Sequence, residues 1–313
     1  MATRIDDPAD ARLDDYRQLK DPARQTLEST RRVFVVEGRL AVAELLRSRY
    51  EIVSLLVGEH QATRDVGDHP GPPRAAGSAV AASALVAPAE AAGARVYVAS
   101  RATVASTVGF DLHRGVVAVA RRPEPLAPEE LVATAIATAR DKQSRPMLAV
   151  LEGLNDHENL GALFRNAAAF GVAGVLLDPR CADPLYRRSV RVSLGQVLNV
   201  PFARLASWPA QPSELLRRSG IRLAALAPEH SSSAAGLGRE PEPLRPWARR
   251  VAATQPVALL LGAEGPGLTR QAIDVADDIV AIPIAAGVDS LNVATAAALA
   301  FYELGAARCS EEV

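Results

Sequence analysis

The chain has 313 residues, of which 49% are hydrophobic, and this is enough to bury the cores of two domains. Its 35 basic and 36 acidic residues leave a net charge of −1, which excludes a global basic field as the means of holding a nucleic acid. Any such partner must therefore be bound by local patches.

The cysteines predict a reducing compartment, and the hydropathy pattern predicts neither a signal peptide nor a membrane span. Cys181 and Cys309 are far apart and form no Cys-X-X-Cys pair, which argues against a disulfide framework and against a zinc site. The N-terminal residues are too charged for a signal peptide, and no apolar run approaches the length of a membrane span. We expect a cytoplasmic protein with no membrane partner and no metal.

The first part of the chain predicts a polar extension and then a small domain. Residues 1–32 carry seven basic and seven acidic side chains, so we expect a helical extension outside the core. Residues 33–122 contain strand and helix patterns typical of a smaller α/β domain: "RVFVVEGRLAVAELLRS", "EIVSLLVGE" and "RGVVAVARR". The prolines of "PEPLAPEEL" interrupt this pattern, and residues 123–146 are interpreted as a linker.

From residue 147 to residue 313, short apolar strands alternate with helices. The expected strands are "MLAVLE", "VAGVLLD", "NVPFARL", "IRLAALA", "PVALLLG" and "DIVAIPI". Short apolar strands bounded by helices are typical of a parallel sheet whose two faces are both covered. In such sheets ligands bind at the carboxyl ends of the strands, so the loops after the strands are the places to search for a site.

The first such loop lies in "LEGLNDHENLGALFRNAAAF". We expect a helix from near Leu160 that Asn159 can cap, with Arg165 two turns inside it. Leu163, Ala167 and Phe170 follow a helical spacing and should face the core, which would point Arg165 elsewhere. An ordinary turn and an exposed arginine would also explain these residues.

The second and third loops also carry polar residues that a turn does not require. In "LLLGAEGPGLT", glycines surround Glu264, and a carboxylate at the end of a buried strand needs a partner. In "IPIAAGVDSLNVATAAALAFYEL", Ser290 is the expected helix cap, and Asn292 in the first turn also needs a partner for its amide. The glycine pattern matches neither the Walker motif nor GxGxxG.

A basic patch is the remaining candidate. In "DPRCADPLYRRSVRVSLGQ", Arg180, Arg187, Arg188 and Arg191 outnumber Asp183. A solvated helix face explains these arginines about as well as a track for phosphates does.

Together these stretches resemble the SpoU/TrmH family of RNA ribose methyltransferases, in the SPOUT class. "NLGALFRNAAAFGVAGVLL", "LLLGAEGPGLT" and "IPIAAGVDSLNVATAAALAFYE" are similar to the three family motifs and occur in the family's order. "FVVEGRLAVAELL" and "HRGVVAVA" resemble the ribosomal-protein-like substrate-binding domain that precedes many catalytic domains of the family.

The resemblance implies a parallel-sheet SPOUT domain with a deep trefoil knot, S-adenosylmethionine as cofactor, and methyl transfer to a ribose 2′-hydroxyl of structured RNA. It favours ribosomal over transfer RNA and implies a homodimer through the C-terminal domain. The implied catalytic residues are Asn159, Arg165, Glu264, Ser290 and Asn292. The implied cofactor-binding residues are Leu226, Ala227, Leu261, Gly262, Gly265, Ile282, Ile284 and Leu291. The RNA-binding candidates are His113, Arg114, Arg187, Arg188 and Arg191.

A guanidinium with a pKa above roughly 12 is a poor general base, so we expect Arg165 to clamp the phosphate beside the target ribose. Glu264 or that phosphate would then accept the proton. Two alternatives remain open. One is a catalytically silent RNA-binding or ribosome-assembly factor on the same fold, and the other is a nucleotide-binding enzyme with a Rossmann-like sheet.

Overall fold

The structure is a computed structural model of the chain. It describes residues 2–21, 28, 30–59, 80–110, 112, 115–142, 144–229, 238–252, 255–285 and 287–309. The chain forms two compact units, of which the first comprises residues 1–124 and 185–199 and the second comprises residues 125–184 and 200–313. No helix in the described ranges has the length and apolar character of a membrane span.

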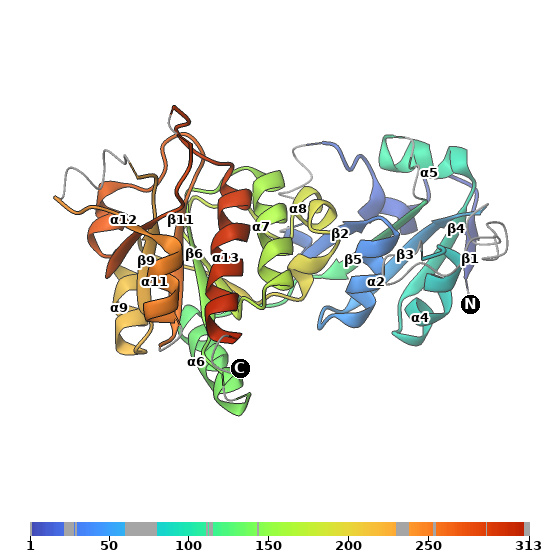
Figure 1. Ribbon diagram of the computed structural model, residues 1–313. Coiled ribbons are helices and arrows are strands. Elements are labelled where there is room, and N and C mark those ends of the chain that lie inside the picture. Colours follow the sequence, from blue (N-terminus) through green and yellow to red (C-terminus); the bar gives the residue numbers. More distant parts are fainter. Residues whose placement is uncertain are drawn as a thin grey trace, which may run out of the picture. The chain divides into compact units, whose positions relative to one another are not determined.

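The first unit contains a five-stranded sheet of mixed direction (Figure 1). Its strands are β1 (Thr3–Ile5), β2 (Val33–Glu37), β3 (Ile52–Gly58), β4 (Arg95–Ala99) and β5 (Val116–Arg121), in the order β1-β4-β3-β5-β2. In the described residues, its helices are the 3-10 helices η1 (Ala11–Tyr16), η2 (Ser83–Leu85) and η3 (Gln196–Leu198), and α2 (Arg39–Arg47), α4 (Val86–Ala91), α5 (Arg101–Val108) and α8 (Arg187–Val192). β5 pairs antiparallel with β2 and β3, whereas β4 pairs parallel with β3 and β1.

The N-terminal residues belong to the core of this unit, which differs from the expected polar extension. β1 pairs with β4 at the edge of the sheet, and Leu13 and Tyr16 of η1 are fully buried against it. The Tyr16 hydroxyl lies 2.6 Å from Ser54 Oγ, so its polar end has a partner inside the core. A few well-spaced apolar side chains are sufficient for burial even where most of their neighbours are charged.

The second unit contains a seven-stranded sheet in which every pair of neighbouring strands is parallel. Its strands are β6 (Met147–Glu152), β7 (Gly174–Leu177), β8 (Phe202–Arg204), β9 (Arg222–Leu226), β10 (Glu242–Pro243), β11 (Val257–Gly262) and β12 (Asp278–Ala281). They lie in the order β10-β12-β9-β11-β6-β7-β8. The predicted parallel α/β class is confirmed, and the trefoil knot stays a prediction.

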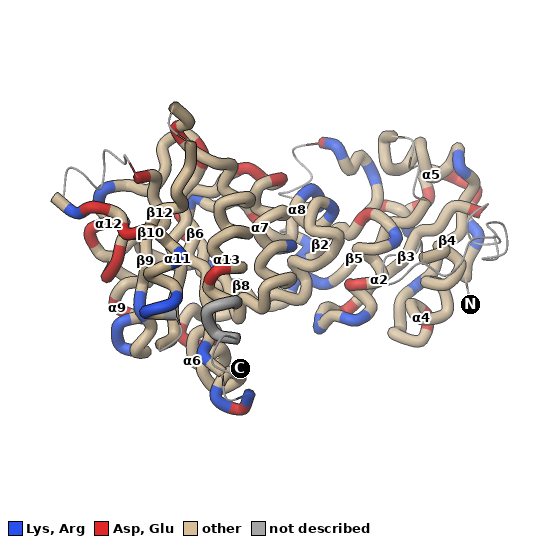
Figure 2. Tube along the Cα trace, in the orientation of Figure 1, with Lys and Arg blue, Asp and Glu red and all other residues tan. Residues whose placement is uncertain are grey.

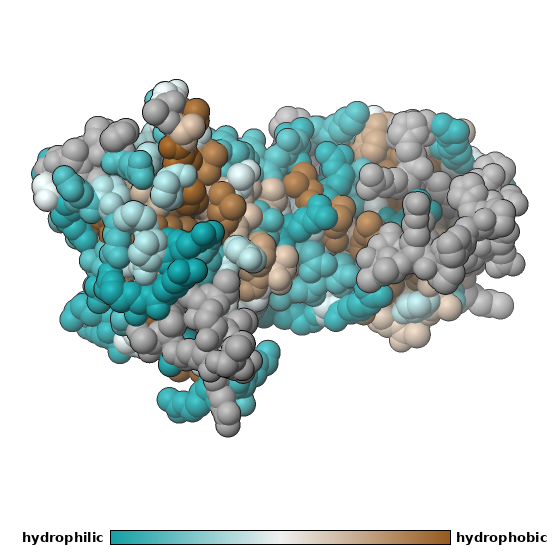
Figure 3. Space-filling model, in the orientation of Figure 1, coloured by the Kyte–Doolittle hydropathy of each residue, from teal (hydrophilic) through white to brown (hydrophobic). Residues whose placement is uncertain are grey.

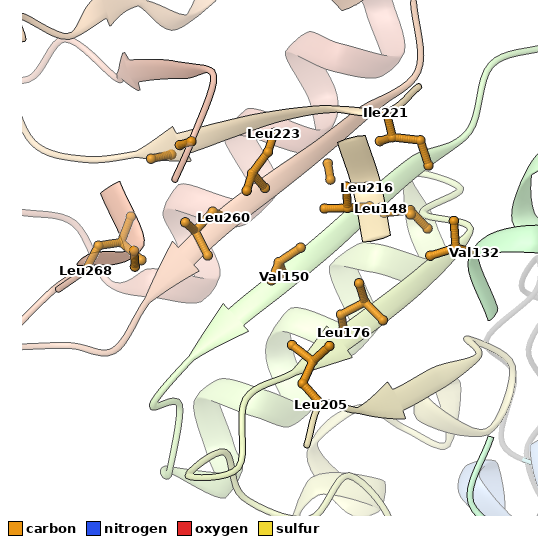
Figure 4. Packing of buried hydrophobic residues seen from close by; sticks show 14 of the residues in the cluster. Val132, Leu148, Val150, Leu176, Leu205, Leu216, Ile221, Leu223, Leu260 and Leu268 are labelled. Carbon is orange, nitrogen blue, oxygen red and sulfur yellow. The ribbon is translucent and has the colours of Figure 1, made fainter. Parts of the chain in front are cut away.

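Helices cover both faces of this sheet. They are α6 (Pro128–Asp141), α7 (His157–Ala169), α9 (Ala210–Arg218), α11 (Leu244–Trp247), the π-helical turn η4 (Ala248–Ala252), α12 (Arg270–Asp274) and α13 (Val293–Cys309). α6, α9 and α12 contribute to one apolar layer together with side chains such as Leu148, Val150 and Leu260 of the strands (Figure 4). α7 and α13 lie side by side on the other face, where α11 also packs (Figure 1).

Helix α6 occupies most of the segment that the sequence predicts as a linker. Leu131 and Val132 on this helix are almost completely buried in the apolar layer of the second unit. The prolines that suggested a break lie before the helix or at its first residue, Pro128, where proline is tolerated because the first helical N–H needs no partner. Most of the predicted linker therefore belongs to the second unit, which begins at residue 125.

Candidate functional site at the carboxyl edge of the parallel sheet

All three motif loops leave the same edge of the second sheet. They follow β6, β11 and β12, and because these strands are parallel their carboxyl ends lie together. β6 and β11 are immediate neighbours, and β9 separates β11 from β12. The topology therefore brings together segments that are far apart in the sequence.

In the first loop, Asp156 rather than Asn159 caps the helix. The Asp156 carboxylate accepts hydrogen bonds from the backbone N–H groups of Glu158 and Asn159, both at 2.8 Å, and α7 begins at His157. The predicted start near Leu160 and the predicted capping role of Asn159 are both wrong. Aspartate and asparagine are equally good caps, and the chain uses the earlier one. The Asn159 side chain is thereby left available for another contact.

In the third loop, Asn292 takes the capping position predicted for Ser290. Its Oδ1 accepts hydrogen bonds from the N–H groups of Ala294 at 3.0 Å and Thr295 at 3.1 Å, and α13 begins at Val293. The capping prediction for Ser290 is therefore wrong. Ser290 is an exposed residue of the preceding loop.

The same Asn292 side chain connects the three loops. Its Nδ2 donates to Asn159 Oδ1 at 2.8 Å and to Glu264 Oε1 at 2.5 Å. The Val293 N–H also points to Glu264 Oε1, at 3.4 Å, so the carboxylate lies at the positive end of α13. We call Asn159, Glu264 and Asn292 the three-loop cluster. Its members supply the partners that the sequence indicated for Glu264 and Asn292.

Arg165 lies on α7 with its side chain exposed. It forms no hydrogen bond or ion pair with any residue that the structure describes, so its guanidinium donors are available to a ligand. Leu163 and Ala167 are buried as expected, but Phe170 is 36% exposed. The prediction for Phe170 is wrong because the helix ends at Ala169 and Phe170 no longer follows its buried stripe.

The glycine-rich second loop folds back on the end of its own strand. Ala263 and Gly267 form an isolated antiparallel bridge, with the Gly267 N–H 3.0 Å from the Ala263 oxygen. A Cβ atom at Gly262 would lie only 2.5 Å from the Gly267 carbonyl carbon and the Leu268 nitrogen. The close approach therefore requires glycine at 262, and it holds Glu264 at the exposed tip of the loop.

The residues expected to bind a cofactor lie at the ends of three adjacent strands. They are Leu226 and Ala227 at and after the end of β9, Leu261, Gly262 and Gly265 at and after the end of β11, and Ile282, Ile284 and Leu291 after β12. Leu226, Ile282, Ile284 and Leu291 are half-buried, so they present apolar surface at the same edge. Apolar side chains at the carboxyl ends of parallel strands are typical of a site for a small organic ligand.

A second polar group at this edge is centred on Glu152, which sequence reasoning missed. Glu152 is the last residue of β6 and is 1% exposed. Its carboxylate accepts hydrogen bonds from Thr269 N–H at 2.9 Å, Thr269 Oγ1 at 2.7 Å and Trp208 Nε1 at 2.6 Å. The signal that could have found it is the single charge at the end of an otherwise apolar strand.

The loop after β7 completes this group. Asp178 is fully buried and accepts hydrogen bonds from the N–H groups of Arg180 at 3.0 Å and Cys181 at 2.8 Å. The Arg204 guanidinium donates to the carbonyl oxygens of Asp178, Pro179, Cys181 and Ala182. Burial, together with Asp178, raises the pKa of the Cys181 thiol to about 12, so Cys181 is not a nucleophile at neutral pH. We call Glu152, Asp178, Arg180, Thr269 and Trp208 the buried-carboxylate cluster.

The other basic candidates belong to the first unit. Arg187 on α8 pairs with Glu37 at 2.5 Å and its side chain is 12% exposed, so it supports the packing of α8 on β2. Arg191 lies 3.7 Å from the same carboxylate, and Arg188 is exposed. Figure 2 shows basic positions on α8 in blue. His113 and Arg114 lie outside the described residues. Within the described ranges, no group of three or more side chains has a composition that could hold a metal ion.

Fold and site together define an α/β enzyme with its site at the carboxyl edge of a parallel sheet. A sequence model of the SpoU rRNA Methylase family matches residues 146–302. An uncharacterised tRNA/rRNA methyltransferase of Mycobacterium bovis is 42% identical over 298 residues, which cover 95% of this chain and 89% of that protein. The 23S rRNA (guanosine-2′-O-)-methyltransferase RlmB of Yersinia pestis is 30% identical over 220 residues, 70% of this chain and 81% of that protein.

A solved structure shares the fold. The AdoMet-bound rRNA methyltransferase from Sinorhizobium meliloti superposes with a TM-score of 0.71 at 21% identity, over 97% of each chain. The chain belongs to the SpoU rRNA methylase family, as its motifs predicted. It is an RNA methyltransferase, and its cofactor is S-adenosylmethionine.

Proposed function

We propose that the protein methylates a ribose 2′-hydroxyl in structured RNA, with ribosomal RNA as the substrate. The observation that carries this proposal is the three-loop cluster, in which Asn292 holds Asn159 and Glu264 at one edge of the sheet. A silent RNA-binding protein would not need these polar groups to be joined and exposed. The relative from Yersinia pestis, which is named a 23S rRNA 2′-O-methyltransferase, supports the choice of ribosomal RNA.

The residues at the ends of β9, β11 and β12 fit S-adenosylmethionine. Half-buried Leu226, Ile282 and Leu291 would contact its apolar parts. Gly262 has no side chain, which allows the loop after β11 to turn back closely beside this site. When bound, the cofactor supplies an electrophilic methyl group on a sulfonium. The remaining requirements are alignment of the ribose and removal of one proton, and these fall to the protein.

Arg165 and the three-loop cluster supply these requirements. The exposed Arg165 guanidinium binds the phosphate beside the target ribose, because a planar fork of N–H donors matches phosphate oxygens. Asn159 and Asn292 orient the hydroxyl and the carboxylate by hydrogen bonds, and Ser290 contributes a further hydroxyl from the adjacent loop. As its oxygen accepted the methyl group, the ribose hydroxyl would lose its proton to an acceptor beside it.

Glu264 is the acceptor of that proton in this proposal. Its Oε1 is occupied by Asn292 and Val293, whereas its Oε2 forms no hydrogen bond with any residue in the described ranges. One carboxylate oxygen is therefore fixed and the other is open to a ligand. Conversion of Glu264 to glutamine would keep the shape of the side chain and remove the acceptor.

The test is transfer of a labelled methyl group from S-adenosylmethionine to RNA from cells that lack this gene. The RNA is separated by size and then hydrolysed with alkali. Label in the large ribosomal RNA, recovered in alkali-resistant dinucleotides, is expected because a 2′-O-methyl group blocks cleavage. Label in mononucleotides would show base methylation and would contradict the proposal, and RNA binding without any transfer would favour the silent assembly factor.

We also infer that the protein is a homodimer through the second unit. Phe170 and Tyr302 are 36% and 56% exposed and form an edge-to-face pair with ring centroids 6.2 Å apart, and Leu299 lies one turn away on α13. Apolar residues gather over α13 and the loop before it (Figure 3). Exposed apolar side chains in a group are typical of protein interfaces. Light scattering should show a dimer for the wild-type protein and a monomer for Leu299→Arg.

The basic residues of α8 complete the proposal. Arg188 and Arg191 would contact RNA, together with His113 and Arg114, whereas Arg187 would hold α8 in place through Glu37. The enzyme would act in the cytoplasm, where ribosomal RNA is made and assembled.

A further inference from the structure

The loop after β7 holds Arg180 in a defined position at the carboxyl edge. Its Nε donates to Asp178 Oδ2 at 3.2 Å, and its Nη2 lies 3.5 Å from Glu152 Oε1. Both carboxylates are buried, and the backbone of the loop is fixed by Arg204 on four carbonyl oxygens. The guanidinium is therefore oriented before any ligand arrives.

Despite these anchors, the Arg180 side chain is 63% exposed. Its Nη1 forms no hydrogen bond with any residue that the structure describes, so one side of the guanidinium fork still has free donors. An arginine needed only to neutralise buried carboxylates would normally be buried with them. The arrangement instead places a fixed anchor on one side and open donors on the other.

Arg180 lies next to the loops of the site. A Cβ atom on Gly153, the first residue after β6, would be 3.6 Å from Arg180 Nη2 and 3.8 Å from the Ala263 side chain. Ala263 immediately precedes Glu264, and Gly153 begins the loop that leads to Asn159. Arg180 is thus next to the first and second motif loops.

We propose that Arg180 binds a phosphate of the RNA strand beside the target nucleotide. The inference rests on the proposed function, because it takes the RNA to cross the edge where the three-loop cluster lies. Arg180 and Arg204 balance the charges of Glu152 and Asp178, so this edge carries no net positive field, and a phosphate would be attracted locally by the charge and the oriented donors of the exposed Arg180 guanidinium. Arg165 and Arg180 then hold the strand at two places.

The experiment compares the wild-type protein with Arg180→Gln and Arg180→Lys. The probe is large-subunit ribosomal RNA purified from cells that lack the gene, and RNA affinity is measured at several salt concentrations. Arg217→Gln is the matched control, because Arg217 is also an exposed arginine paired with a carboxylate, at the C-terminal end of α9 before β9 and hence at the opposite edge. Binding of S-adenosylmethionine and thermal unfolding are measured for every variant.

Arg180→Gln should weaken RNA binding about 5- to 20-fold and lower the slope of log K against log salt by about 1, since one phosphate contact is lost. Arg180→Lys should keep the slope because it keeps the charge, and Arg217→Gln should match the wild type. If Arg180 had only a structural role, its replacement would leave the salt slope unchanged. The inference is overturned if Arg180→Gln has the same slope and the same RNA affinity as the wild type.

Two further outcomes separate this inference from the proposed function. If the wild-type protein binds and methylates the RNA but Arg180→Gln behaves identically, only the role of Arg180 falls. If the wild-type protein binds S-adenosylmethionine but not the RNA, the ribosomal substrate and the role of Arg180 both fall. If Arg180→Gln unfolds, a reduced salt slope in Arg180→Lys would also overturn the inference, since the charge is still present there.

Discussion

Two polar clusters lie at the same edge of the parallel sheet, and they differ in exposure. In the three-loop cluster, Glu264 and Asn292 are exposed, and the bonds among its members join loops. In the buried-carboxylate cluster, Glu152 and Asp178 are almost inaccessible, and their bonds fix the backbone of loops and the start of α12. A carboxylate that meets substrate must remain open, whereas one that supports a loop is more effective when it is enclosed.

The comparison predicts different consequences of mutation in the two clusters. Substitutions near the exposed cluster should reduce the rate of methylation with little change in the free energy of unfolding. Substitutions of the buried carboxylates should reduce the free energy of unfolding first. Arg180 is the exception, because it belongs to the buried cluster but presents donors to solvent.

The largest effect on the rate is expected for Arg165→Ala. Loss of a cation that orients the substrate and stabilises developing charge should slow methylation at least about 100-fold. Because Arg165 is exposed and unbonded to any described residue, the melting temperature should not change. Label transfer and thermal unfolding check both parts. A variant with nearly full activity would remove Arg165 from the mechanism.

Glu152→Ala should give the largest effect on stability. It leaves the N–H groups of Thr269 and Trp208 without their acceptor inside the protein, and we expect a loss of about 2–4 kcal/mol in the free energy of unfolding. Urea denaturation measures it. Glu214→Ala, which removes an exposed carboxylate on α9, is the control and should leave the free energy of unfolding nearly unchanged, because solvent screens its ion pair. If Glu152→Ala and Glu214→Ala reduced the free energy of unfolding equally, the buried-carboxylate cluster would make no special contribution to stability.

A smaller effect, divided between rate and stability, is expected at Asn292. Asn292→Ala removes the cap of α13 at a cost of about 1 kcal/mol and also releases Asn159 and Glu264, so the rate should fall about 10-fold. Asn292→Ser should restore the cap but not the rate, because one hydroxyl proton cannot serve both acceptors. Full recovery of the rate in the serine variant would mean that the link between the loops is unimportant.

The smallest effect is expected far from both clusters, at the amino end of β12. Burial raises the pKa of Asp278, but hydrogen bonds from Arg222 at 2.5 and 2.9 Å outweigh it, so the net pKa lies below the ordinary 3.8. A carboxyl with a lowered folded pKa stabilises the protein above its unfolded pKa and loses that contribution as the pH falls through the folded value. At neutral pH, the free energy of unfolding of the wild-type protein should exceed that of Asp278→Asn by up to about 1 kcal/mol.

This difference should begin to shrink as the pH falls below the ordinary pKa of 3.8 and should be smaller at pH 3 than at pH 7, which urea denaturation at the two pH values would measure. If the difference in the free energy of unfolding between the wild type and Asp278→Asn grew on acidification, the prediction would be contradicted. The methylation rate at neutral pH should be the same in both proteins, because the pair lies at the edge opposite the site.

The strands were predictable because their information is local. The run of apolar residues that predicts a strand at 147–152 forms β6 over the same residues, and the runs at 221–227 and 256–262 contain β9 and β11. The N-terminal segment was not predictable in this way, because Ile5, Leu13 and Tyr16 are separated by charged residues and become a core only when β1 pairs with β4. The positions of the helix caps were also undetermined, since several neighbouring residues are suitable caps.

The sequence by itself determined the strands of the parallel sheet, the three loops and the residue types they offer, because apolar periodicity and turn residues act over short distances. The tertiary structure decided which side chains meet. Asn292 is 133 residues from Asn159 and 28 from Glu264, and only the strand order β12-β9-β11-β6 brings them within hydrogen-bond distance. Likewise, Glu152 became a buried support because its partners Trp208 and Thr269 arrive from loops after β8 and β11. Contacts of this kind depend on topology, which no local pattern specifies.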